Sequence, residues 1–456
     1  MDWLKRKHRE GGMWEMLVIA FPMLVANACD TVIIFTDRLF VAKLGSIQMN
    51  ASFIGGLSVY LLMTFFVGLT GYATALIAQH LGAGQKDACA RVLTQAVIIA
   101  VLAFPITLAC RPLVYYLFEA MHINPAQIAL QKQYFNILSY IIFFGLIKNC
   151  FNSYFAGIGK TGVIMVAACV SMSFNVFLNY ILIYGKFGCP AYGMVGAAYG
   201  SIIASFFGFL VLIWVYLGDK NQKEFGIKAA YIFDWPLMRK LLHLGYPAGL
   251  ELFLNMLSFT MLVMLFHSVS PVAATAASIV FNWDIVAYVP LLGVEIGVTS
   301  LVGRYMGAGK PEIAHQSMLS GIRFGICFSA ILFILFLFAP AMLVNVFSPL
   351  EPTKAFLNSA SIAENMLRMS SIYVLTEVIM LAMVGALRGA GDTFWAMVLT
   401  VSLHWVLVPL LYIILHVLHL APEVAWLTLI ATFFVFLGFV VRRYNQGAWK
   451  QIKLVN

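Results

Sequence analysis

Charged residues are scarce in this chain: Asp, Glu, Lys and Arg together make up 10% of its 456 residues. Soluble globular proteins carry roughly a quarter charged residues, because their surfaces must face water. So few charges exclude a soluble domain, and the mean hydropathy of +0.92 agrees. The chain is therefore predicted to be an all-α integral membrane protein.

Sequence motifs for metal binding and catalysis are also missing. The seven cysteines are scattered without a Cys-x-x-Cys pair, and no His-Glu-x-x-His pattern occurs. Isolated thiols of this kind are usually packing residues. We therefore expect no enzyme activity, no catalytic residue, no cofactor and no metal site built from these residues.

Long apolar runs, by contrast, fill most of the chain. A run of about 20 apolar residues is the length that crosses a bilayer. The sequence predicts twelve transmembrane helices, near 14–40, 52–78, 92–118, 131–157, 163–185, 193–218, 244–269, 274–303, 319–347, 366–388, 395–417 and 423–441.

Local signals recur about half a chain apart. Pro22 returns as Pro247, and the Gly-Ala-Gly turn at 82–84 returns at 307–309. Two copies of one plan are typical of secondary transporters. We predict two six-helix lobes related by a pseudo-twofold axis along the membrane normal. Their bounds are 1–218 for the amino-terminal lobe, 219–240 for a cytoplasmic linker, and 241–456 for the carboxy-terminal lobe.

The net charge of +9 is distributed in a way that argues against nucleic acid as a partner. Basic residues gather in alternate loops, as the positive-inside rule describes for membrane proteins. This predicts a multi-pass protein of the inner (plasma) membrane with both termini cytoplasmic. The residues concerned are Lys5, Arg6, Lys7, Arg9, Lys86, Arg91, Lys160, Lys220, Lys223, Lys228, Arg239, Lys240, Arg304, Lys310, Arg388, Arg442, Arg443, Lys450 and Lys453.

Acidic residues within the apolar runs need a reason, because a charge at bilayer depth costs at least ~2.5–3.5 kcal/mol. Asp30 and Asp37 are seven residues apart, which brings them to within about 20° of one helix face. Either carboxylate could bind a proton or a cation. The alternative is a structural ion pair or an interfacial charge.

Amide and hydroxyl groups could complete such a site. Asn175 and Asn179 share a helix face, and Ser201 lies in the next helix. Asparagine in a membrane can simply join helices. However, these groups and Asp37 could together bind a hard cation. Alternatively, they could hold the Asp37 carboxylate while it gains and loses a proton.

The second half carries a different set of polar residues in its apolar runs. Glu251 and Asn255 share a face of the seventh predicted helix, and Glu377 lies in the tenth. Asp284 and Glu295 fall in the eighth, where each could be interfacial or paired.

Several of these residues match a known pattern, so that over nearly its full length the chain resembles the multidrug and toxic compound extrusion (MATE) family, in particular its bacterial NorM and DinF branches. The match rests on Pro22 followed by Asp37 and Phe40-Val41-Ala42-Lys43-Leu44-Gly45; on Asn175-x-x-x-Asn179-Tyr180; on Gly185-Lys186-Phe187-Gly188-x-Pro190; on Gly196-Ala197-Ala198; and on Leu387-Arg388-Gly389-x-Gly391-Asp392-Thr393.

The resemblance implies a fold of two six-helix lobes around a V-shaped central cavity. It also implies exchange of H⁺ or Na⁺ for small organic, often cationic, compounds by a monomer in the lipid bilayer. Asp37 matches the family's amino-lobe ion-binding carboxylate, and Asn175, Asn179 and Ser201 match its neighbours. Glu377 matches the acidic residue that serves the carboxy-lobe site in Na⁺-coupled members.

The chain also departs from the family pattern. Asn255 stands where Na⁺-coupled relatives often carry Glu, with Glu251 one turn earlier, so the carboxy-lobe site is altered or shifted. Asp30 is an additional acid that could extend a proton path.

Pro22 lacks a backbone donor, and we expect a kink in the first helix there.

Two other functions remain open from the sequence. A lipid-linked oligosaccharide flippase would share the architecture but would favour a strongly basic cavity, and the few intramembrane basic residues argue weakly against it. An intramembrane lipid-modifying enzyme would need a clustered catalytic motif, which the sequence does not contain.

Overall fold

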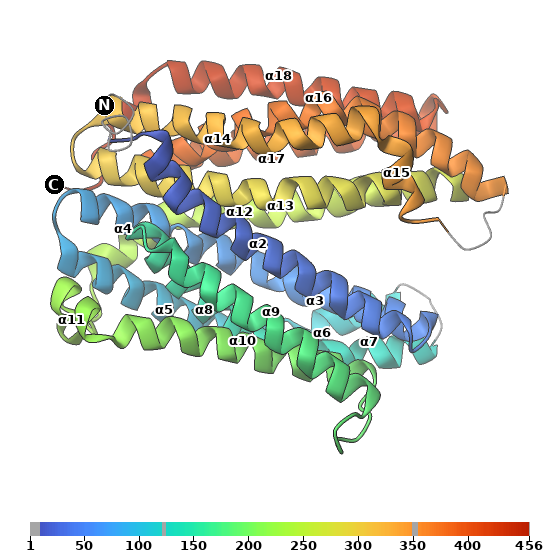
Figure 1. Cartoon of the computed structure of the whole chain (residues 1–456), viewed down its shortest axis with the longest axis horizontal. Coiled ribbons are helices and arrows are strands. Elements are labelled where there is room, and N and C mark those ends of the chain that lie inside the picture. Colours follow the sequence, from blue (N-terminus) through green and yellow to red (C-terminus); the bar gives the residue numbers. More distant parts are fainter. Residues whose placement is uncertain (1–9, 121–124, 349–353, 456) are drawn as a thin grey trace, which may run out of the picture. The chain divides into compact units, whose positions relative to one another are not determined.

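The computed structural model describes residues 10–120, 125–348 and 354–455, and every regular element in these ranges is a helix (Figure 1). Within these ranges, eleven helices are long and apolar enough to cross a membrane, or twelve if one bent pair counts as a single span. That pair, α7 (Pro125–Leu138) and α8 (Ile141–Gly157), meets at 43° and replaces the single predicted segment 131–157. The basic residues Lys5, Arg6, Lys7 and Arg9 lie outside the described residues.

By their internal contacts the residues group into two compact units. The amino unit comprises Val25–Leu252 and the chain end from Leu454. Besides α7, α8 and parts of α2 and α12, its elements are α3 (Ser46–Gly71), α4 (Ala73–Gly82), α5 (Lys86–Ala109), α6 (Arg111–Ala120), α9 (Thr161–Tyr184), α10 (Met194–Leu217), α11 (Asp219–Phe225) and η1 (Ile227–Ala229).

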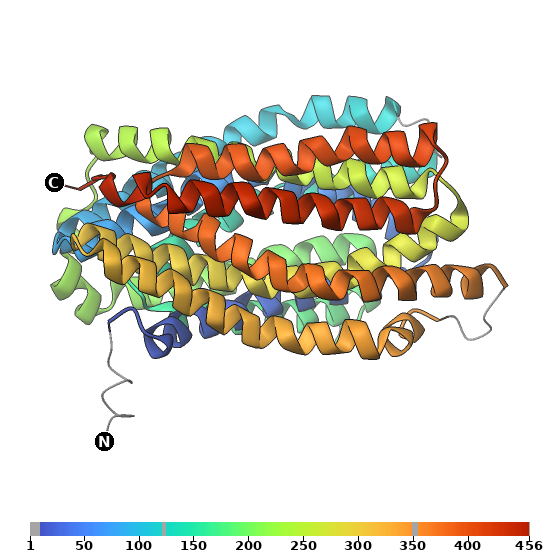
Figure 2. The same cartoon turned by 90° about the horizontal axis from the view of Figure 1, so that it is seen from above.

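The carboxy unit comprises the chain up to Leu24 together with Phe253–Lys453. In it the long helices α13, α14 and α16 pack along one another (Figures 1 and 2). Besides parts of α2 and α12, its elements are α13 (Pro271–Gly307), α14 (Pro311–Phe338), α15 (Pro340–Asn345), α16 (Lys354–Ala390), α17 (Thr393–Tyr412), η2 (Ile413–Val417), α18 (Pro422–Asn445) and η3 (Ala448–Gln451).

Two helices contribute to both units. Helix α2 (Met13–Ala42) begins in the carboxy unit and passes into the amino unit after Leu24. Helix α12 (Trp235–His267) makes the reverse passage after Leu252. Pro22 lies inside α2 just before this passage, and the helix continues through it. The predicted lobe bounds stay a prediction, since the grouping by contacts divides the chain within these helices.

Glycines explain how the first part of each shared helix is held. A methyl group on Gly293 of α13 would lie 2.6 Å from the backbone nitrogen of Leu24 in α2. A methyl group on Gly68 of α3 would lie 2.7 Å from Cα of Gly249 in α12. Only glycine permits such close helix approach. Gly68 and Gly293 occupy equivalent places in the two halves, so the repeat also repeats this packing.

A second pair of glycines repeats in the same way. A methyl group on Gly157 of α8 would lie 2.9 Å from the carbonyl oxygen of Thr74 in α4. A methyl group on Gly389 of α16, the equivalent glycine of the second half, would lie 2.6 Å from the carbonyl oxygen of Thr299 in α13. The sequence repeat therefore corresponds to the same helix–helix contact in each unit.

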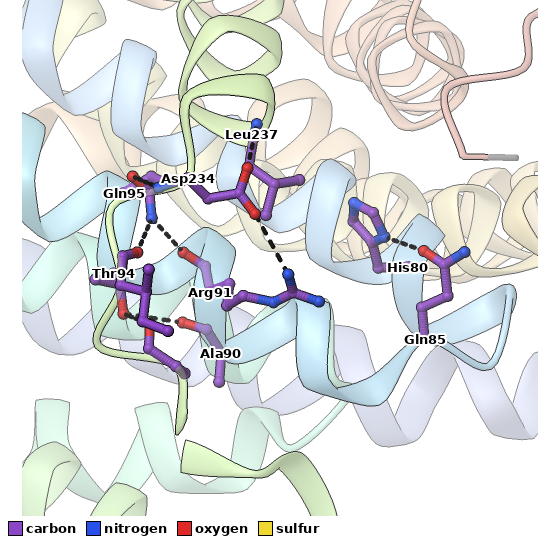
Figure 3. A network of polar contacts seen from close by, with 10 residues as sticks. His80, Gln85, Ala90, Arg91, Thr94, Gln95, Asp234 and Leu237 are labelled. Carbon is purple, nitrogen blue, oxygen red and sulfur yellow. Dashed lines mark hydrogen bonds and ion pairs between the residues drawn. The ribbon is translucent and has the colours of Figure 1, made fainter. Parts of the chain in front are cut away.

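The linker between the halves is fixed to α5 by polar contacts (Figure 3). Asp234 accepts a hydrogen bond from the backbone nitrogen of Leu237 at 3.1 Å, which caps α12, and pairs with Arg91 at 3.4 Å. The amide nitrogen of Gln95 donates to the carbonyl oxygen of Ile232 at 2.9 Å.

Helix α11 is held by a carboxylate between two lysines. Glu224 pairs with Lys86 and with Lys160, each at 3.2 Å. Burial raises the pKa of the Glu224 carboxyl, but the hydrogen bonds and charges of the two lysines together outweigh it and hold this pKa below its usual range. The carboxylate is therefore ionised at neutral pH, and the linker stays attached.

Candidate functional site

Asp37, in the second half of α2, accepts two side-chain hydrogen bonds within the amino unit. Nδ2 of Asn179 in α9 donates to Oδ1, and the hydroxyl of Ser201 in α10 donates to Oδ2 at 3.0 Å. Asn175 closes the ring, because its Nδ2 donates to Oγ of Ser201 at 3.1 Å and its Oδ1 accepts from Asn179 at 3.2 Å. The structure thus brings all four predicted residues into one polar ring.

The local sequence explains why the ring forms. The spacing of four puts Asn175 and Asn179 on one face of α9, and both are fully buried. Gly200 of α10 faces this surface, where a methyl group would overlap Oδ1 of Asn179. Glycine at that position therefore lets the asparagine side chain reach Asp37.

The hydrogen bonds of the ring have a direction. Both oxygens of Asp37 act as acceptors, as they do in an ionised carboxylate. Hydrogen bonds to a charged group are roughly twice as strong as those between neutral groups. Among the described residues, Oδ1 of Asn179 has no hydrogen-bond partner. The ring as it stands is therefore arranged to stabilise the negative charge of Asp37.

Asp30 lies outside the ring. Its side chain is exposed, although the helical spacing places it near the same face of α2 as Asp37. Its neighbour Cys29 is buried, with Sγ 3.7 Å from Sγ of Cys169 in α9. The predicted role of Asp30 in a proton path stays a prediction.

The carboxy unit holds a second acidic cluster. The hydroxyl of Tyr373 donates to Oε1 of Glu377 at 2.7 Å, one turn along α16, and both residues are buried. Asp284 of α13 lies close enough to interact with both of them. No hydrogen-bond partner for Oε2 of Glu377 occurs in the described part of the chain.

The remaining two predicted residues, Glu251 and Asn255, both lie in α12. Glu251 is buried and belongs to the amino unit, whereas Asn255, one turn later in α12, belongs to the carboxy unit. Both residues lie in the continuous helix α12, one turn apart, where helical periodicity places their side chains on one face. Glu295 forms an ion pair with Arg388 of α16 inside the carboxy unit, which is a structural role.

Sequence reasoning missed two tyrosines. Tyr373 could have been found, because it lies four residues before Glu377 on the same helix face. Tyr134 of α7 is buried and close enough to Asp37 for the two groups to interact electrostatically. It has no recognisable signal, because only the tertiary fold brings α7 to α2.

Comparisons with known proteins match most of the chain to one family model and to several named relatives. Residues 22–181 and 247–413 match the family model described as MatE. A probable multidrug resistance protein NorM from Thermotoga maritima is 24% identical over 449 residues, covering 96% of this chain and 93% of that protein. A protein of the same description from Bacillus subtilis is 27% identical, covering 91% and 92%. The multidrug resistance protein MdtK of Yersinia enterocolitica is 25% identical, covering 86% and 85%.

Solved structures show the same fold. A transporter of the MOP superfamily from Pyrococcus furiosus, described as having a binding pocket of reverse polarity, gives a TM-score of 0.88 at 19% identity and covers 99% of each chain. An outward-facing multidrug resistance transporter of the MATE family gives 0.85 at 19% identity, covering 95% of this chain and 96% of the other.

Proposed function

The chain belongs to the MatE family, and on this basis we propose that it is a secondary active efflux antiporter for amphiphilic or cationic organic compounds. It is a multi-pass membrane protein of a transporter family, not an enzyme, which removes the lipid-modifying enzyme from the alternatives. The observation that carries the proposal is the closed polar ring around Asp37, a carboxylate held ready for a coupling ion within a transmembrane helix.

In the proposed cycle, a compound from the cytoplasm binds in a cavity open to the inside, and the protein then opens to the outside. Asp37 takes up the coupling ion there, the compound leaves, and the return to the inward-open state releases the ion inside. A potential of 100 mV contributes about 2.3 kcal/mol per charge moved. This supports more than a tenfold gradient of an uncharged compound.

We propose H⁺ as the coupling ion. A proton on Asp37 requires the new O–H to donate, and Oγ of Ser201 can accept it once the serine hydroxyl turns away, for example to a carbonyl one helical turn back. Na⁺ would need oxygens where the ring presents two amide NH₂ groups, so both asparagines would have to turn over. The proton needs the smaller rearrangement.

The carboxy-unit cluster is the proposed second ion site. The hydroxyl of Tyr373 has a single proton and can donate to one carboxylate at a time. With Glu377 and Asp284 both close to it, the cluster is suited to hold an extra proton between two carboxyl groups. Asp284 would then replace, as the second carboxylate of the site, the Glu that Na⁺-coupled relatives often carry at the position of Asn255.

Two basic residues of the membrane segments, Lys148 and Arg368, give the flippase alternative no support. Lys148 donates a hydrogen bond to Ser171 at 3.3 Å, and Arg368 pairs with Glu364 at 3.5 Å. Both cations are engaged locally. We propose cytoplasmic termini in the inner membrane, with the basic linker on the same side.

The test is efflux of a fluorescent cationic dye from proteoliposomes under an imposed pH gradient or an imposed Na⁺ gradient, each applied alone. The proposal predicts efflux driven by the pH gradient. Efflux driven only by Na⁺ would overturn the choice of ion, and efflux driven by neither would overturn antiport itself.

A further inference from the structure

A small pocket is lined in part by α7. Helix α7 lies at the end of the amino unit opposite α11 (Figure 1). The volume of the pocket is about 320 Å³, and its walls come from the end of α2, the start of α3, α7, and the segment leading into α10. Polar side chains contribute to the wall together with apolar ones. Its lining includes Leu44, Gln48, Leu130, Gln133, Tyr192 and Met194. In the proposed orientation this end faces outward.

The pocket is close to the ring around Asp37 along two helices. Leu44 follows Asp37 by seven residues, and Met194 precedes Ser201 by seven residues. Seven residues of helix span about 10 Å. The pocket therefore ends about two helical turns from the carboxylate, on the outward side.

Helix α7 contributes Leu130 and Gln133 to the pocket wall and carries two buried polar side chains next to them in sequence. Gln131, next to the pocket residue Leu130, is fully buried, and neither Nε2 nor Oε1 has a hydrogen-bond partner within the described ranges. Tyr134, one turn deeper on the same buried face, interacts with Asp37. Gly55 of α3 leaves room for both, since a methyl group there would lie 3.1 Å from the Tyr134 ring and 3.4 Å from the carbonyl oxygen of Gln131.

An unpaired buried amide is unusual. Leaving one buried donor or acceptor without a partner costs about 1–3 kcal/mol, so native proteins pair such groups with protein or with ordered water. A glutamine amide and a tyrosine hydroxyl both donate and accept. Each can therefore hold water on two sides. The water and the tyrosine hydroxyl can pass a proton along, because each accepts one proton and releases another, whereas the glutamine amide holds the water in place.

We infer that the pocket, Gln131 and Tyr134 form the outer access path to Asp37, with the Gln131 amide holding the water through which the coupling ion reaches the carboxylate. This inference rests on the proposed function. Gln131 is a positioning residue, because it acts through water and through Tyr134.

The first test compares Gln131→Met with the unchanged protein in proteoliposomes. Loss of about one hydrogen-bonded step should slow the initial rate of pH-driven dye efflux on the order of tenfold. Dye affinity and the number of protons released on dye binding at equilibrium should stay unchanged, because Asp37 itself is intact. Gln131→Asn, which keeps an amide, should recover most of the rate, and Gln222→Met on α11 should have no effect.

The second test does not depend on that variant. Gln133→Cys at the pocket wall should become sensitive to a membrane-impermeant thiol reagent added outside, with loss of efflux, whereas the unchanged protein stays active. A normal rate in Gln131→Met together with an insensitive Gln133→Cys would overturn the access path. If instead Asp37→Asn keeps ion-driven efflux, the proposed function itself is wrong, and not only the proposed access path to Asp37.

Discussion

The hydroxyl of Ser201 in α10 donates a 3.0 Å hydrogen bond to Oδ2 of Asp37 in α2, across 164 residues of sequence. Helix α2 is one of the two helices that belong to both units, since its first part packs in the carboxy unit. A change in the hydrogen bonds of Asp37 therefore acts on a helix whose other end is part of the carboxy unit. Helix α2 is therefore the element that we expect to transmit ion binding at Asp37 to the carboxy unit.

Removing that hydroxyl should change the pH dependence of transport. Ser201→Ala deletes a donor to the ionised carboxylate, worth about 1.5–3 kcal/mol. Loss of a bond to the charged form favours the protonated form, so the half-maximal pH of transport should rise by about 1–2 units. Ser201→Thr keeps the hydroxyl and should keep the midpoint. An unchanged midpoint in Ser201→Ala would show that this hydrogen bond does not govern the ion site.

A single methyl group should disturb the ring from outside. Gly200→Ala would overlap Oδ1 of Asn179 and push its amide away from Asp37. We expect dye efflux to fall by on the order of tenfold or more, the equivalent of ~1.4 kcal/mol, in protein that still purifies as a single species. Gly162→Ala is the matched control, because its methyl group would meet nothing within 4 Å. Equal activity of both variants would contradict the packing argument.

Two thiols on α2 and α9, helices that also supply ring residues, offer a test of helix movement. Sγ of Cys29 in α2 lies 3.7 Å from Sγ of Cys169 in α9. Oxidation by copper phenanthroline and oxygen, which takes two electrons and releases two protons, should join them in a disulfide detectable by mass spectrometry. If α2 repacks during transport, the cross-link should stop efflux, and reduction should restore it. Cys169→Ser should be insensitive, and a cross-linked protein with normal efflux would rule out such repacking.

Stability of the carboxy unit should depend on the Glu295–Arg388 ion pair. The Glu295 side chain is only 6% exposed, and removing one partner of a buried pair typically costs about 3–5 kcal/mol. Glu295→Gln should therefore lower the temperature at which the purified protein loses its monodisperse form. Glu364→Gln breaks the more exposed pair with Arg368 and should cost no more than ~1 kcal/mol. Equal thermal stability of the two variants would refute the structural role.

The sequence was most informative where an ionisable or amide group interrupts an apolar run. Asp37, Asn175, Asn179 and Ser201 could be singled out in this way, because each needs a polar partner and the fourfold spacing fixes one helix face. The repeated Gly-Ala-Gly turns could also be recognised, whereas only the structure shows that Gly68 and Gly293 permit close helix packing.

Other features depend on which helices meet, which periodicity does not encode. Helical spacing puts Asp30 near the face of Asp37, yet only Asp37 is covered by α9 and α10. The passage of α2 and α12 between units, and the 43° bend between α7 and α8, likewise follow from tertiary packing. Gln131 had no signal at all, since a glutamine is remarkable only once it is seen buried and unpaired.

The central claim is that Asp37 couples ion movement to export, and its most direct test is Asp37→Asn reconstituted at equal protein level with Asp219→Asn of α11 as the control. The account predicts that Asp37→Asn still binds the dye but shows no efflux under a pH gradient, whereas Asp219→Asn exports normally. Ion-driven efflux by Asp37→Asn at the rate of the unchanged protein would contradict it.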